Sequence, residues 1–274
     1  MDFMKKYEYW LNSDSIDEKD KEELRGLKDN PKEIEDRFFK DLSFGTGGIR
    51  GVRGIGTNRI NKYVIRKATQ GLANYMLTFN EKEAKEQGII IAHDCRIGSR
   101  EYALNTARVM AANGIKAYIY EDLRSTPELS FGVRYKGTMA GIVVTASHNP
   151  VEYNGYKVYW NDGAQVVDPH ATLIVDEVNK ISTLEEIKVI SEENGREKGL
   201  IIQLDNKIDD DYIKEIKKQT IISEIQGKES FKIVYTPLHG TGGRPMERIL
   251  TDFGYSYEVV KEQIKPDGNF PTVT

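Results

Sequence analysis

A short apolar run that ends in a polar cluster constrains this chain more than any other feature of its sequence. Residues 139–144 (Met-Ala-Gly-Ile-Val-Val) predict a buried strand, and residues 145–150 (Thr-Ala-Ser-His-Asn-Pro) follow it directly. Open α/β sheets bind their ligands beyond the carboxyl ends of their strands, which is where Ser147, His148 and Asn149 are expected to lie. The proline that closes the cluster favours extended backbone in the residue before it, so we expect a stiff loop.

Strand-like and helix-like segments alternate along most of the chain. The expected strands are residues 88–92, 115–120, 139–144, 155–160, 200–204 and 231–235. The expected helices are residues 99–112, 127–135, 209–218 and 245–250, with Ser99 as a helix cap. The glycine-rich segment 44–51 is expected to form no regular element. Such alternation predicts an α/β fold with a doubly wound, mixed and mostly parallel sheet.

We expect three parts along the chain. Residues 1–43 are a helical leader packed on the first domain, and residues 44–199 are a three-layer α/β/α domain. Residues 200–274 are a second, incomplete α/β domain of related topology. The charged stretch 182–198 is a candidate linker between the two domains or a surface excursion of the first.

Composition narrows the class of protein. The 274 residues are 39% hydrophobic, and no apolar run approaches the roughly 20 residues of a membrane span. Charges of both signs are mixed to a net −4, without the basic stripe of a nucleic-acid-binding protein. The one cysteine, Cys95, and the absence of a signal-peptide pattern favour a cytoplasmic enzyme. Cys95 and the nearby His93 lack the partner residues of a metal site.

Ser147 has more than one interpretation. A serine at a strand end can cap a turn, or it can act as a nucleophile or as a carrier of phosphate. A serine hydrolase fits less well, because neighbouring side chains of an extended segment point to opposite sides and no Gly-x-Ser-x-Gly elbow is present. His148 and Asn149 fit better as donors to an anion carried near the serine.

Two basic residues are candidates for contact with the same anion. Lys157 follows in an alternating segment, and it reaches the phosphate or takes a hydroxyl proton if that strand returns beside the serine loop. Arg50 follows Gly47 and Gly48, whose backbone is free to approach an anion, and its guanidinium matches a phosphate bidentately. The alternatives are a solvated lysine and a tight glycine-rich connection.

Other polar loop residues are expected to act mainly in structure. Asp94, Arg96 and Ser99 follow another predicted strand, and local capping and ion pairing are the favoured interpretation. His239 lies in a glycine-rich loop after a strand and is as readily structural as ligand-binding.

Three segments resemble motifs of one enzyme family. Residues 145–150 resemble the active-site loop of the α-D-phosphohexomutases, the phosphoglucomutase/phosphomannomutase enzymes. Residues 44–51 (Phe-Gly-Thr-Gly-Gly-Ile-Arg-Gly) are similar to their glycine–arginine motif, and residues 154–157 (Asn-Gly-Tyr-Lys) to their lysine segment. The leader and residues 236–240 look more like the phosphoglucomutase branch that includes phosphopentomutases.

The resemblance implies a four-domain isomerase of carbohydrate metabolism that works by phosphotransfer and carries phosphate on Ser147. It implies that the Ser147 phosphate ligates Mg²⁺, and that Arg50 and His148 stabilise the transferring group. Lys157 is then the general acid/base, and Arg50, Asn149 and Lys157 bind the substrate phosphate. The implied substrate is a hexose 1-phosphate or 6-phosphate, with glucose favoured, and the implied priming donor is glucose 1,6-bisphosphate.

The chain also departs from the family pattern. The Asp-x-Asp-x-Asp metal loop, the sugar loop and the C-terminal phosphate loop do not occur in these 274 residues. We therefore expect the N-terminal portion of a longer enzyme, inactive alone, with the missing C-terminal domains as its partner. The alternatives are a phosphopentomutase or phosphomannomutase of the same family, and a non-catalytic module that binds sugar phosphate.

Overall fold

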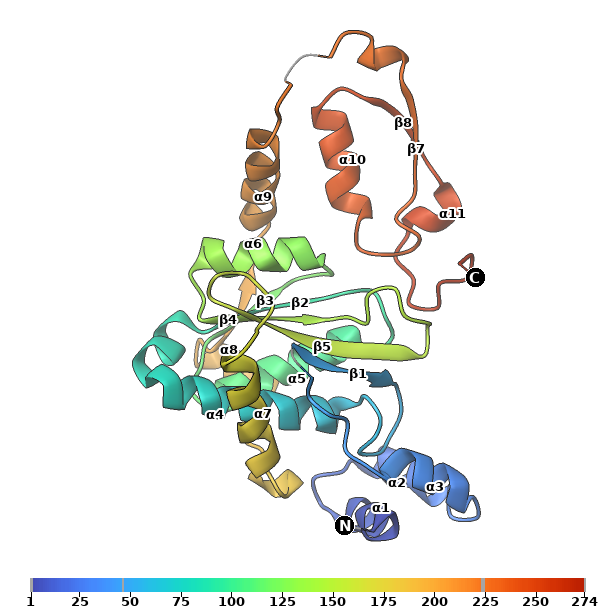
Figure 1. Ribbon diagram of the computed structural model, residues 1–274, viewed down its shortest axis with the longest axis vertical. Helices are drawn as coiled ribbons and strands as arrows, with labels where there is room; N and C mark the ends of the chain where they lie inside the picture. Colours follow the sequence, from blue (N-terminus) through green and yellow to red (C-terminus); the bar gives the residue numbers. More distant parts are fainter. Residues whose placement is uncertain (1, 46, 223–224, 274) are drawn as a thin grey trace.

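A six-stranded sheet lies at the centre of the computed structural model, which describes residues 2–45, 47–222 and 225–273 (Figure 1). Its strands are β1 (Gly48–Val52), β2 (Ile89–His93), β3 (Ala117–Tyr120), β4 (Ala140–Val144), β5 (Tyr153–Trp160) and β6 (Ile201–Leu204). Their order is β1-β5-β4-β2-β3-β6. β5 runs antiparallel to the other five strands, so the sheet is mixed and mostly parallel, as predicted.

Helices cover both faces of this sheet (Figure 1). One face carries α4 (Lys62–Gln87), α5 (Ser99–Ala112), α7 (His170–Lys180) and the short α8 (Glu192–Glu197). The other carries α6 (Thr126–Lys136) and α9 (Lys207–Lys218). All five residues of β2 and of β4 are buried, because strands covered on both sides need apolar side chains in both directions. The predicted three-layer α/β/α architecture is confirmed.

The leader forms a small core of its own beneath the sheet (Figure 1). Its helices are α1 (Phe3–Asn12), α2 (Glu18–Arg25) and α3 (Pro31–Phe38). The Trp10 ring packs edge-on against Phe38 and against Tyr63, with centroids 5.6 and 5.5 Å apart. Tyr63 belongs to α4, so this aromatic cluster joins the leader to the first domain.

Three expectations about local structure are corrected. Residues 48–52 form strand β1, because Gly48 lies so close to β5 that a Cβ there would meet the Tyr156 carbonyl oxygen. Ser99 is the first residue of α5 and not its cap; the cap is Gly98. The strand expected to open the second domain, β6, pairs in parallel with β3 and completes the first sheet, so the two sheets divide after Leu204 and not at residues 199/200.

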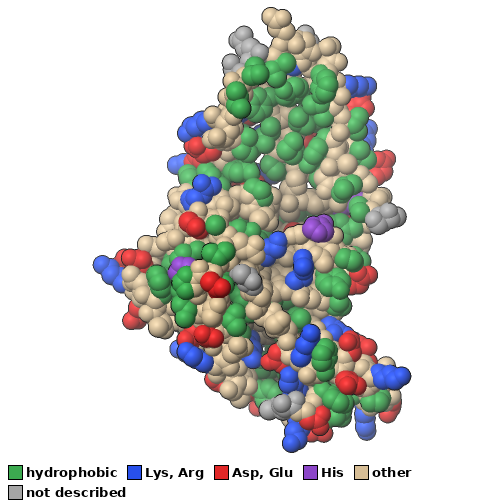
Figure 2. Space-filling view, in the orientation of Figure 1, with side chains coloured by type: hydrophobic (Ala, Val, Ile, Leu, Met, Phe, Trp, Pro, Cys, Tyr) green, Lys and Arg blue, Asp and Glu red, His purple; other side chains and the backbone are tan. Residues whose placement is uncertain are grey.

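The second unit is much smaller (Figure 1). Beyond α9 it comprises β7 (Lys232–Tyr235), α10 (Gly243–Asp252), β8 (Ser256–Val259) and α11 (Lys261–Ile264). β7 and β8 form a two-stranded parallel sheet, and hydrophobic side chains gather on the surface of this part in Figure 2. Exposed ones include Phe231 and Val234. Two strands bury little apolar surface, so contacts with the first domain contribute to holding this unit in place.

No helix in the described part of the chain combines the length and the apolar character of a membrane span.

One contact between the leader and residues 182–198, which lie within the first domain because β6 joins its sheet, gives a prediction about pH. The Tyr9 hydroxyl and the Ser13 hydroxyl each donate to the Glu185 carboxylate over 2.6 Å. The Ser13 and Tyr9 hydrogen bonds lower the pKa of Glu185 to about 2. Because the folded-state pKa lies below the unfolded one, the stabilisation is complete above pH 4.5 and is lost as the pH falls toward 2.

We therefore expect Glu185→Gln to lower the free energy of unfolding by about 1 kcal/mol at neutral pH, a value reduced for the exposure of the carboxylate. The difference from wild type should vanish near pH 2. Urea unfolding at several pH values measures it, with Glu8→Gln on the exposed side of α1 as control. A difference independent of pH would contradict the assignment.

Candidate active site

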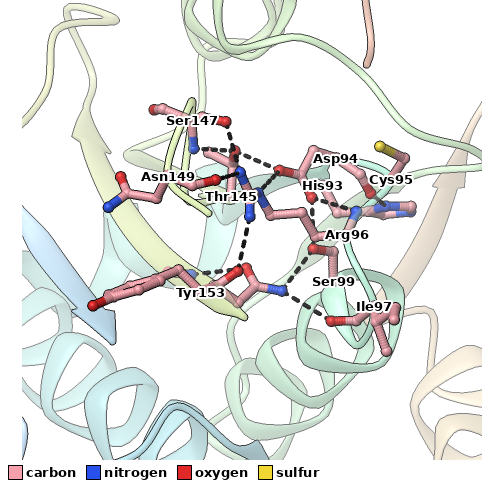
Figure 3. Close-up of polar contacts among 12 residues, drawn as sticks. His93, Asp94, Cys95, Arg96, Ile97, Ser99, Thr145, Ser147, Asn149 and Tyr153 are labelled. Carbon is pink, nitrogen blue, oxygen red and sulfur yellow. Dashed lines mark hydrogen bonds and ion pairs between the residues drawn. The ribbon is translucent and has the colours of Figure 1, made fainter. Parts of the chain in front are cut away.

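The Ser147 loop begins where β4 ends, and its backbone is held by the neighbouring strand end. Ser147 has φ of 56°, in the left-handed region that non-glycine residues rarely adopt. Its N–H donates to the Thr145 hydroxyl over 2.9 Å, and that hydroxyl donates to Asp94 Oδ2 over 2.6 Å. Asp94 follows β2, which lies beside β4, so the two loops meet at one edge of the sheet (Figure 3). Strained backbone of this kind is concentrated at functional sites.

Lys157 reaches Ser147 because β5 returns antiparallel to β4. The register pairs Val143 with Lys157, and Lys157 Nζ lies 2.7 Å from Ser147 Oγ. Burial lowers the pKa of Lys157, and the positive charge of Arg50 lowers it further. The structure thus brings the predicted lysine to the predicted serine and disfavours its charge, as expected of a proton-transferring lysine.

Arg50 joins the same site from the other side of β5. It lies on β1, opposite Gly155, and its Nη1 donates to Asn149 Oδ1 over 2.9 Å. The guanidinium is exposed, as are Ser147 and His148, so these side chains are accessible to a ligand. Thr46 of the glycine–arginine segment lies outside the described residues. An arginine and a lysine beside an exposed serine form a site suited to an anion.

Asp94, Arg96 and Ser99 form the support of this loop. The Arg96 N–H and the Ser99 hydroxyl both donate to Asp94 Oδ1, over 2.9 and 2.6 Å, which is the expected local capping. Sequence reasoning missed the role of the Arg96 guanidinium, which is buried and donates to backbone carbonyls of the serine loop (Figure 3). Those carbonyls belong to Ser147, Asn149, Pro150 and Tyr153, at 3.0, 2.5, 2.8 and 3.0 Å. The one sequence signal for this role was the position of Asp94 and Arg96 directly after a predicted strand, since such strand ends meet at one edge of the sheet.

The remaining candidates lie outside the serine site. His93 is buried, its Nδ1 is 2.8 Å from the Asp94 carbonyl oxygen, and burial lowers its pKa. His239 is buried in the second unit, where its ring nitrogens bond Lys265 and Thr272. These contacts give His239 a structural role.

Within the described residues, no three His, Cys, Asp or Glu side chains lie close enough together to hold a metal ion. The described residues around Ser147 therefore do not by themselves make up the octahedral set of oxygen ligands of a complete Mg²⁺ site.

Comparison with known proteins agrees with this geometry. The family model for phosphoglucomutase/phosphomannomutase alpha/beta/alpha domain I matches residues 41–185. The model for domain II of the same family matches residues 210–274. The chain belongs to the phosphoglucomutase/phosphomannomutase family. The three segments that contain Arg50, Ser147 and Lys157 all fall within the domain I match.

Relatives of this family are similar over part of their length. The chain is 39% identical over 233 residues to a phosphoglucomutase of Staphylococcus saprophyticus, covering 85% of this chain and 41% of that protein. It is 37% identical over 254 residues to a phosphoglucomutase of Staphylococcus aureus strain MRSA252, covering 91% of this chain and 44% of that protein. The chain thus spans about two fifths of the curated relatives it matches.

Solved structures share the fold. A phosphoglucomutase/phosphomannomutase family protein from Burkholderia thailandensis superposes with a TM-score of 0.64 at 22% identity, over 85% of this chain and 46% of that one. The Paramecium phosphoglucomutase parafusin, in its open form, gives 0.62 at 20% identity, over 84% and 44%.

Proposed function

We propose that this chain is the phosphoserine-bearing part of a phosphohexomutase, which interconverts hexose 1-phosphate and hexose 6-phosphate, with glucose as the preferred sugar. The contact of 2.7 Å between Lys157 Nζ and Ser147 Oγ carries the proposal, because it pairs an exposed nucleophile with a proton donor of lowered pKa. The family membership supports the same reaction class.

In the proposed reaction, a phosphoryl group carried on Ser147 passes to a free hydroxyl of a hexose monophosphate. A phosphorus–oxygen bond forms to the sugar oxygen, whose hydroxyl proton passes to water. The bond to Ser147 Oγ breaks, and Oγ takes a proton from Lys157, which water then reprotonates. Arg50 and His148 offset the charge on the transferring group, and Asn149 holds the Arg50 guanidinium in place. The sugar bisphosphate then reorients in the site so that its other phosphate faces Ser147. Ser147 accepts that phosphate by the reverse step.

The cofactors and partners belong to the same proposal. Mg²⁺ would supply charge neutralisation at the Ser147 phosphate, with carboxylate ligands from C-terminal domains that these 274 residues do not include. Glucose 1,6-bisphosphate would prime the serine, and the enzyme would act in the cytoplasm. The leader, the serine domain and the second domain are then the N-terminal portion of the enzyme, with negligible mutase turnover alone.

The proposal is tested by incubating the chain with glucose 1,6-bisphosphate and Mg²⁺ and measuring its intact mass. We expect one phosphoryl group per chain, located at Ser147 by peptide mapping. Mannose 1,6-bisphosphate and ribose 1,5-bisphosphate in parallel reactions compare the donors. An unchanged mass with every donor, together with measurable sugar phosphate binding, would show a binding module instead.

Replacement of Lys157 by methionine should slow this labelling by about a hundredfold, because methionine keeps the length of the side chain and removes its proton. The rate is followed by intact mass against time. Lys116→Met, on the surface beside β3, is the control and should label at the wild-type rate. Equal labelling rates in the two variants would show that Lys157 takes no part in the proton transfer.

A further inference from the structure

The second unit contacts the loop that supports Ser147. At Gly268 an added Cβ would lie 2.6 Å from the Cys95 carbonyl oxygen and 2.8 Å from the Ile97 nitrogen. The Phe270 ring centroid lies 5.1 Å from Cζ of Arg96. The Cys95 thiol donates to the His239 carbonyl oxygen over 3.1 Å. Backbone, ring and thiol contacts thus join the two parts of the chain at Cys95–Ile97.

A network within the second unit holds Gly268 and Phe270 in this position. His239 Nδ1 donates to the Lys265 carbonyl oxygen over 3.1 Å, and Nε2 accepts from the Thr272 hydroxyl over 2.9 Å. The Asp267 N–H donates to the His239 carbonyl oxygen over 3.2 Å. One buried imidazole thereby ties both ends of the segment 265–272, which contains the contacts to the first domain.

Backbone strain is concentrated at the same junction. Among the described residues, the non-glycine residues with positive φ are Ser147, Leu238, His239 and Phe270, at 56°, 50°, 62° and 48°. Ser147 is the serine of the active site, and the other three lie in the two segments of the second unit that meet Cys95–Ile97. Such conformations persist only where their surroundings hold them. The strained serine and the strained contact segments lie on the two sides of the Cys95–Ile97 loop, so each is held by the same junction.

Arg96 connects the two sides. Its guanidinium donates to the carbonyls of Ser147 and Asn149 through Nη2 and to those of Pro150 and Tyr153 through Nη1. The side chain is only 3% exposed, and Nε makes no hydrogen bond, although Asp94 Oδ2 lies 3.4 Å away. The Phe270 ring packs against the same cation, and a cation stacked on an aromatic face is attracted by the ring electrons.

We propose that Phe270 of the second unit fixes the Ser147 loop through Arg96, so that Arg96 and Phe270 are positioning residues for phosphoryl transfer. The Phe270 ring and the close approach of Gly268 hold the arginine, and the arginine holds the four carbonyls of the serine loop. The kinetic part rests on the proposed function; the structural part does not.

The experiment compares Phe270→Leu, Phe270→Tyr and Gly268→Ala in the 274-residue chain. Leucine keeps apolar bulk and lacks the aromatic face, tyrosine keeps the face, and alanine at residue 268 forces the backbones apart. Phe231→Ala, at an exposed phenylalanine of the same unit, is the matched control.

Hydrogen exchange of the Ser147, Asn149 and Tyr153 amides reports loop order without any reaction. We expect Phe270→Leu and Gly268→Ala to accelerate exchange at these amides by about three- to tenfold, with Phe270→Tyr and Phe231→Ala at wild-type rates. Cys95, the one cysteine of the chain, should also react faster with iodoacetamide in Gly268→Ala, because its thiol loses the His239 carbonyl. Unchanged exchange in both Phe270→Leu and Gly268→Ala would overturn the proposal.

The labelling reaction separates this inference from the proposed function. In Phe270→Leu we expect a lower maximal rate of Ser147 labelling at an unchanged half-saturating concentration of glucose 1,6-bisphosphate, with recovery in Phe270→Tyr. A wild-type chain that exchanges as expected but acquires no phosphate would refute the proposed function and leave the structural coupling intact. Altered exchange with an unaltered maximal rate would overturn the positioning role.

Discussion

Ser147→Ala is expected to abolish phosphoryl transfer to this chain completely. The wild-type chain should gain one phosphoryl group from glucose 1,6-bisphosphate and the variant none, because Ser147 Oγ is the oxygen that Lys157 contacts over 2.7 Å. Intact mass spectrometry after incubation with the donor and Mg²⁺ measures the difference. The loss should be complete because alanine offers no oxygen to form the phosphate ester.

A matched control keeps this result specific. Ser191 caps α8, away from the site, and Ser191→Ala should be labelled to the same extent as wild type. Amide exchange at Thr145 and Asn149 should show that the loop still folds in Ser147→Ala. Phosphate that persists on the Ser147→Ala chain would mean that another residue carries it.

Asp209→Ala should produce the largest loss of stability. Asp209 on α9 accepts from Nε and Nη2 of Arg124 over 2.8 Å each, and the side chains are 10% and 5% exposed. Removal of the carboxylate leaves the buried Arg124 guanidinium without its bidentate partner, with the Glu128 charge nearby. We therefore expect the free energy of unfolding to fall by about 3 kcal/mol.

The adjacent Asp210 provides the control for this prediction. It pairs with Arg248 over 2.6 Å, but both side chains are exposed, at 52% and 40%. Asp210→Ala should therefore cost less than about 1 kcal/mol. Urea unfolding followed by tryptophan fluorescence compares the two variants. Equal losses would show that burial of the Arg124–Asp209 pair does not govern its contribution.

The strand that precedes the serine could be predicted because its signal is local. The apolar run at residues 139–144 has no exposed face and became the fully buried strand β4. The expectation that β6 opens the second domain was wrong, because sheet membership depends on contacts with distant segments. Its sequence shows a strand but cannot show which sheet it joins, and pairing with β3 is decided by contacts more than 80 residues apart in sequence, such as Ala117 with Ile201.

Residues in the site divide in the same way. Ser147, Lys157 and Arg50 carried recognisable chemistry in recognisable segments, so sequence alone nominated them. The chemistry of Arg96 did not indicate its role, because an arginine close to an aspartate normally forms an ion pair with it. Its donation to four carbonyls of the serine loop depends on β2 lying beside β4.

The sequence by itself indicated most of the strands of the central sheet, the mixed α/β class and the candidate residues of the serine loop, because side-chain pattern is a property of short segments. Only the tertiary structure decided that Lys157 meets Ser147, that Arg96 supports the loop and that Phe270 packs on Arg96. Those contacts follow from strand order, register and the docking of the second unit. Each contact depends on the free energy of packing segments that lie far apart in the chain. No single segment determines that free energy.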